Sequence, residues 1–99
     1  MTARAAESLD DRNAAALAEL AALITARYPG ATIEVRPGEE PGERFLMAAV
    51  DLEDPDEVLD LVLDRLLDFQ VGEGLPILVV PLRSPQAEAA YRERVGLAP

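Results

Sequence analysis

The stretch from Leu52 to Leu82 constrains the fold most, because it combines a capped helix, a glycine break and a short apolar run. Asp54 stands where an N-cap is expected, Pro55 is suited to the first helical position, and Glu57 adds an acid at N3. Glycines at 72 and 74 provide turn positions beyond the helix. The pattern predicts a helix over 55–71 followed by a strand over 77–80.

Apolar side chains cover roughly two-thirds of the circumference of this predicted helix, when each residue advances by about 100°. They are Val58, Leu59, Leu61, Val62, Leu63, Leu66, Leu67 and Phe69. A surface helix usually hides a single stripe a little over ~100° wide, so we expect this helix to be covered on more than one side. Residues 77–80 are all apolar and do not alternate, which favours a strand buried on both faces.

Two further helices are predicted, one before and one after this stretch. Ser8 is a suitable N-cap for a long helix that ends near Tyr28, where Pro and Gly follow. Ser84 is the N-cap of a short helix that reaches about Val95, with Gly96 at its C-terminal end. Residues 1–7 are expected to fray, because nothing in their sequence would hold them.

Two strands are predicted between the first two helices. Residues 32–36 alternate polar and apolar side chains, as a half-exposed edge strand does, and the Pro- and Gly-rich residues 37–42 form a hairpin loop. Residues 43–52 are apolar on both faces and are therefore placed at the centre of the sheet. The crossover through the 55–71 helix should be right-handed, which makes strands 43–52 and 77–80 parallel.

These elements predict an α+β fold and one domain over residues 1–99. The order is α-β-β-α-β-α, and a three-stranded mixed β-sheet (a hairpin plus a right-handed βαβ crossover) is packed with helices. Since three helices, one of them short, are few for so much apolar surface, we also expect a homodimer.

Charge narrows the functional classes. The chain carries nineteen acids against nine basic residues, all of them Arg, for a formal net charge of −10. Nucleic-acid binding needs basic patches, so a nucleic-acid partner is not expected. No apolar run approaches the ~20 residues of a membrane span, and residues 1–7 lack the apolar segment of a signal peptide. We expect no membrane association and a cytoplasmic location.

The residues available for catalysis are few. The chain has no His and no Cys, which removes the commonest general base, the thiol nucleophile and the usual zinc ligands. Both serines, Ser8 and Ser84, stand at N-cap positions. The acids of residues 51–57 invite a calcium or magnesium site, but they lack the ligand spacing of an EF-hand loop, and capping explains most of them. We therefore predict a protein that is not an enzyme, with no metal and no cofactor.

An acidic arc is the main candidate for partner binding. Glu57, Asp60, Asp64 and Asp68 occupy the one polar arc of the 55–71 helix. Arg65 and Gln70 interrupt its apolar arc. Arg65 either extends along the surface toward Asp68 or binds a carboxylate of a ligand or second subunit, and Gln70 is a second possible ligand or interface residue.

Three functional classes remain open. The leading expectation is a non-enzymatic acidic protein–protein interaction module, antitoxin-like or inhibitor-like, that binds a basic protein through the acidic arc. The alternative is a small-molecule-binding regulatory domain that uses the sheet face and Arg65. A small enzyme that relies on carboxylates alone is the third class.

Overall fold

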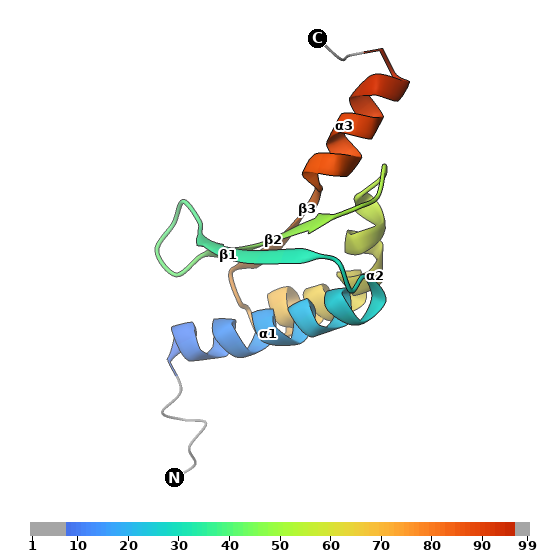
Figure 1. The fold of residues 1–99 in the computed structure, drawn as a ribbon. Coiled ribbons are helices and arrows are strands. Elements are labelled where there is room, and N and C mark those ends of the chain that lie inside the picture. Colours follow the sequence, from blue (N-terminus) through green and yellow to red (C-terminus); the bar gives the residue numbers. More distant parts are fainter. Residues whose placement is uncertain (1–7, 97–99) are drawn as a thin grey trace.

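The computed structural model describes residues 8–96, and its elements follow the predicted α-β-β-α-β-α order (Figure 1). They are the helix α1 (Leu9–Arg27), the strands β1 (Thr32–Pro37) and β2 (Arg44–Val50), the helix α2 (Asp56–Leu67), the π-helical turn η2 (Asp68–Gly72), the strand β3 (Ile77–Arg83) and the helix α3 (Pro85–Arg94). The α+β class is confirmed. The expected fraying of residues 1–7 lies outside the described residues.

The three strands form one mixed sheet in the order β1-β2-β3. β1 pairs with β2 in the antiparallel direction and β3 pairs with β2 in parallel. Leu46 of β2 is opposite Val35 on one side and Val79 on the other. The central position predicted for this strand is therefore confirmed, as are the edge position of β1 and the parallel pairing of β2 with β3.

The core lies between the sheet and a single layer of helices. α1 and α2 cover one face of the sheet, and α3 rises from the opposite side (Figure 1). Leu46, Ala48 and Val50 of β2 point toward the helices and are fully buried. The core cluster has these members: Ala16, Leu17, Leu20, Ile24, Leu46, Ala48, Val50, Val58, Val62, Leu66, Phe69, Leu75, Ile77 and Val79.

The predicted caps of α1 and α3 are formed, whereas α2 begins at Asp56 and Pro55 occupies the N-cap position that was predicted for Asp54. The hydroxyl of Ser8 accepts a hydrogen bond from the Asp11 N–H at 3.1 Å, and that of Ser84 accepts one from the Ala87 N–H at 3.1 Å. The Asp54 carboxylate accepts the N–H of Asp56 at 3.1 Å. These contacts satisfy amides that the first turn of a helix leaves without partners. Both serines thus have the structural role expected from the sequence.

The end of α2 differs from the regular helix predicted to residue 71. From Asp68 the chain widens into a π turn, in which the Glu73 N–H donates to the Asp68 carbonyl at 3.2 Å. The wider turn places Phe69 in the core, where it is almost fully buried. It also brings the Gln70 side-chain amide to the carbonyl of Ile77, the first residue of β3, at 2.8 Å. The π turn thereby joins the helix to the strand that follows.

Two expectations about burial were wrong for the single chain. α2 is covered on one side only, and its outward residues Leu61, Leu63 and Leu67 are 42, 39 and 43% exposed. β3 is not buried on both faces, because Ile77 is 1% exposed and Leu78 is 42% exposed. The reason is the same in both cases. The described chain has only one layer of helices against the sheet, and β3 is an edge strand.

Candidate interaction surfaces

The sheet has one face that α1 and α2 do not cover, and we call it the open face (Figure 1). The strand register identifies its members, because side chains on one face alternate along each strand with those of the core face. The open face consists of Thr32, Glu34, Arg36, Phe45, Met47, Ala49, Leu78, Val80 and Leu82. β2 and β3 thus supply six apolar side chains to one continuous surface.

Solvent reaches this apolar surface. Leu78 and Leu82 of the edge strand are 42 and 40% exposed, and the β2 members are half-buried between their neighbours. The sequence indicated that β2 is apolar on both sides. The structure confirms this, because alternate apolar side chains of β2 lie on the core face and on the open face. Exposed apolar patches of several hundred Å² on a folded protein usually mark an interaction site. The open face is therefore a candidate docking surface.

The polar part of the open face is an ion pair on β1. The Arg36 guanidinium donates to both carboxylate oxygens of Glu34, at 2.8 and 3.2 Å. These hydrogen bonds lower the pKa of Glu34 below its ordinary value and raise that of Arg36, so both stay charged and compensate each other. The open face has no net charge, although the whole chain carries −10.

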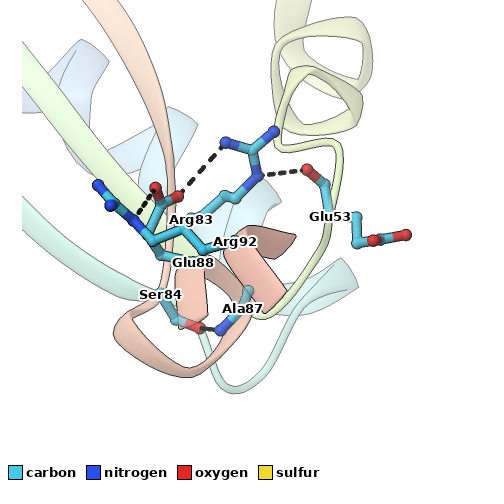
Figure 2. A network of polar contacts seen from close by, with 6 residues as sticks. All are labelled: Glu53, Arg83, Ser84, Ala87, Glu88 and Arg92. Carbon is cyan, nitrogen blue, oxygen red and sulfur yellow. Dashed lines mark hydrogen bonds and ion pairs between the residues drawn. The ribbon is translucent and has the colours of Figure 1, made fainter. Parts of the chain in front are cut away.

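A polar network holds α3 at the end of β3 (Figure 2). Arg83 donates from Nε to the Glu53 carbonyl at 2.6 Å and from Nη1 to Glu88 at 3.4 Å. Its guanidinium also lies 3.8 Å from the ring centroid of Tyr91, and Arg92 pairs with Glu88 at 3.2 Å. Among the residues of α3 only Ala87 is buried. This helix is therefore attached at its base by polar contacts and has almost no core of its own.

The four acids of the predicted docking arc are all exposed. We refer to Glu57, Asp60, Asp64 and Asp68 as the acidic stripe. Asp68 pairs with Arg65 at 3.5 Å, and Glu57 accepts a long hydrogen bond of 3.5 Å from the Tyr28 hydroxyl. Within residues 8–96, Asp60 and Asp64 have neither an ion pair nor a side-chain hydrogen bond. The negative charges in the middle of the stripe are thus the ones with no positively charged or hydrogen-bonding partner among the described side chains.

Arg65 binds a carboxylate of its own chain. Its guanidinium pairs through two nitrogens with Glu19 of α1, with Nη2 to Oε1 at 3.0 Å, and lies 4.2 Å from the ring centroid of Phe69. The pair lowers the pKa of Glu19 and raises that of Arg65. Sequence reasoning found the Asp68 contact but missed Glu19, because no spacing rule relates positions 46 residues apart. Gln70 likewise has an intramolecular partner, and a ligand or interface role for these two residues stays a prediction.

A shallow groove between α1 and β1 was not predicted. It has a volume of about 400 Å³. Three alanines of α1 contribute to its walls, and it is lined by Asp10, Asn13, Ala14, Leu17, Ala18, Ala21, Val35 and Arg44. Asn13 is 1% exposed and donates from its amide to the Gly42 carbonyl at 2.8 Å, which fixes the hairpin loop against α1. The sequence signal for this contact was a polar residue on the apolar stripe of the first helix.

Two other kinds of site are absent from the described residues. In the segment 8–96, no three His, Cys, Asp or Glu side chains are grouped so that they could hold a metal ion. Among the described helices, none combines the length and the hydrophobicity that crossing a bilayer requires. Comparisons of the chain with protein-family models, with curated proteins and with solved structures found no match. The surfaces described above therefore carry the functional argument.

Proposed function

We propose that this chain is a non-enzymatic protein-interaction module, which dimerises through the open face and presents the acidic stripe to a basic protein. The observation that carries the proposal is the open face itself. Two adjacent strands offer six apolar side chains on the side of the sheet that α1 and α2 leave bare. Covering this surface removes apolar area from water, which stabilises an assembly by roughly 25 cal/mol per Å² before the costs of association.

Charge supports a second copy as the occupant of the open face. Two copies that each carry −10 repel one another wherever their acidic surfaces meet. The open face avoids this repulsion, because its only charges are Glu34 and Arg36, which form an ion pair. Moreover, α2 with its acidic stripe lies on the other side of the sheet (Figure 1). A two-fold arrangement of the open faces also gives a closed dimer, the commonest symmetric assembly.

The residue types support a role without catalysis. The chain has neither His nor Cys, and the hydroxyls of Ser8 and Ser84 accept hydrogen bonds from helix amides. A nucleophile activated by an adjacent base, the usual arrangement for covalent catalysis, has no candidate among these groups.

The acidic stripe is the proposed site for the basic protein. In a dimer joined through the open faces, α2 of each copy stays on the outside. Asp60 and Asp64 are one helical turn apart, and like charges at this spacing destabilise a helix by roughly 0.2–0.5 kcal/mol. A complementary positive surface would relieve that repulsion, increase the rate of encounter and set the orientation of the complex.

A pair of leucine variants tests the proposed dimer. Leu78 on the open face and Leu63 on the outer side of α2 are 42 and 39% exposed, so Leu78→Glu and Leu63→Glu make the same change at matched exposure. We expect Leu78→Glu to be a monomer by light scattering, because the dimer would bury an unpaired carboxylate. Leu63→Glu should keep the mass of the unmodified dimer.

Circular dichroism of both variants provides the control for folding, since neither leucine belongs to the core cluster. If only Leu63→Glu dissociates the dimer, the interface lies on α2 and not on the open face. A dimer that tolerates both changes would contradict the proposal, because neither face would then be part of the contact.

A further inference from the structure

The short helix α3 has a side with four apolar residues, two of which the described chain leaves exposed. At 100° per residue, Ala87, Ala90, Tyr91 and Val95 lie within one arc, which also holds Arg94, whose guanidinium pairs with Glu53. Ala87 is buried, Tyr91 is half-buried under Arg83, and Ala90 and Val95 are exposed. A helix of this length is marginal in water without packing. Within residues 8–96, Ala90 and Val95 are therefore the accessible apolar members of the arc.

The charge of α3 distinguishes it from α2. Between Pro85 and Arg94 it has two acids and two arginines, for a net charge of zero, as on the open face. Leu82, an open-face residue that is 40% exposed, lies three positions before α3 begins. The helix also rises on the open-face side of the sheet (Figure 1). A surface without net charge thus extends from the open face of the sheet onto α3.

The size of the open face indicates that it does not complete an interface alone. Three strands about 4.8 Å apart and some 20 Å long give a footprint on the order of 300 Å². A specific interface usually buries about 800 Å² on each partner. Even if the uneven surface of the side chains about doubled this area, the open face would still offer less than the usual buried area. Among the described helices, α3 is the one that rises on the same side of the sheet and can supply further area (Figure 1).

We infer that α3 of each copy packs against the partner subunit through the side that carries Ala90, and so completes the dimer interface of the open faces. This inference rests on the proposed dimerisation. In the single chain Arg83 holds the base of α3 through Glu53 and Glu88 (Figure 2) and also contacts Tyr91. The helix is directed away from the layer of α1 and α2 (Figure 1). The network would then position the helix for a second copy.

Two neighbouring alanines of α3 allow a matched test in the full chain. Ala90 lies on the apolar arc, whereas Ala89 lies on the opposite polar side, and both are exposed. We expect Ala90→Glu to raise the dimer dissociation constant about tenfold or more, because each two-fold interface would bury two carboxylates. Ala89→Glu should stay within about threefold of the unmodified chain. The constants are measured by sedimentation velocity over a dilution series.

Two further measurements make the result decisive. Far-ultraviolet circular dichroism checks that both variants keep the same helix content, and Ala90→Ser, which adds no charge, should keep the dimer. If the unmodified chain is a dimer and neither glutamate weakens it, α3 lies outside the interface and this inference is wrong, while the open-face dimer remains. If the unmodified chain is a monomer, the proposed function itself fails.

Discussion

The two faces of the sheet have similar composition but different surroundings. On the core face Leu46, Val50 and Ile77 are covered by α1 and α2 and are at most 1% exposed. On the open face Phe45, Met47, Leu78, Val80 and Leu82 belong to the same two strands, yet no helix lies over them in Figure 1. Their difference shows that an apolar strand pattern predicts burial without identifying the covering element.

The charges of the chain also differ between the two sides of the sheet. The acidic stripe lies on α2 and on Asp68 at the start of η2, on the covered side of the sheet, whereas the open face and α3 each have no net charge. In a chain with nineteen acids, an uncharged apolar surface is where two copies can approach with the least repulsion. The uncharged open face is therefore the proposed interface between two copies, and the acidic stripe on the other side is the proposed site for a basic protein.

Truncating adjacent residues of β2 should give the largest effect on stability. Leu46 is fully buried and Met47 lies on the open face. In a Leu78→Glu background that keeps the chain monomeric, we expect Leu46→Ala to lower the free energy of unfolding by ~2–5 kcal/mol, because it leaves a cavity. Met47→Ala should cost clearly less, since water already reaches its side chain. Urea unfolding measures both, and equal losses would contradict the difference between the faces.

Neutralising the middle of the acidic stripe should have a smaller effect. Asp60→Asn with Asp64→Asn should raise the free energy of unfolding by about 0.6–1.5 kcal/mol, because it removes three like-charge pairs within the acidic stripe, each costing roughly 0.2–0.5 kcal/mol. The same double variant should weaken the capture of a basic protein at low salt. Glu39→Gln with Glu40→Gln, in the hairpin loop, makes an equal change in charge elsewhere. If both double variants weaken the capture equally, net charge alone explains it.

How far the sequence could predict this structure depends on the range of the interactions. The caps Ser8 and Ser84 were predictable because they act within one helical turn, whereas the N-cap of α2 is Pro55 and not the predicted Asp54. The central position of β2 followed from its two apolar faces. The ion pair of Arg65 with Glu19 and the π turn at the end of α2 were not predictable, because both depend on how distant elements pack together.

The acidic stripe was predicted as a set of residues, and its four members are exposed. The open face was predicted only in part. Alternation in β2 indicated a second apolar face, but periodicity alone led to the wrong expectation that residues 77–80 are buried on both sides. Whether a strand has one or two covered faces is decided by the number of helix layers, which a strand's own sequence does not encode.

The pH dependence of the Glu19–Arg65 pair gives the smallest expected difference, because both side chains are solvent-accessible. Arg65 lowers the pKa of Glu19 in the folded chain below its ordinary value of 4.5. A lowered pKa contributes stability above the unfolded value, and this contribution is lost as the pH falls through the folded value. The stability difference between the unmodified chain and Glu19→Gln should thus be full at neutral pH and shrink below pH 4.5.

Arg65→Gln provides the control for this titration, since Glu19 then lacks its partner. In that background Glu19→Gln should have little effect at any pH. A difference that persisted unchanged in acid would show that Glu19 acts through packing and not through its charge.

Sedimentation equilibrium of the unmodified chain tests the central claim most directly, namely that a second copy covers the open face. The chain has a mass of 10.7 kDa. At tens of micromolar protein and moderate salt, the account predicts a species of twice that mass, which dissociates on dilution and is lost in Leu78→Glu. A mass of 10.7 kDa at every concentration would contradict the claim.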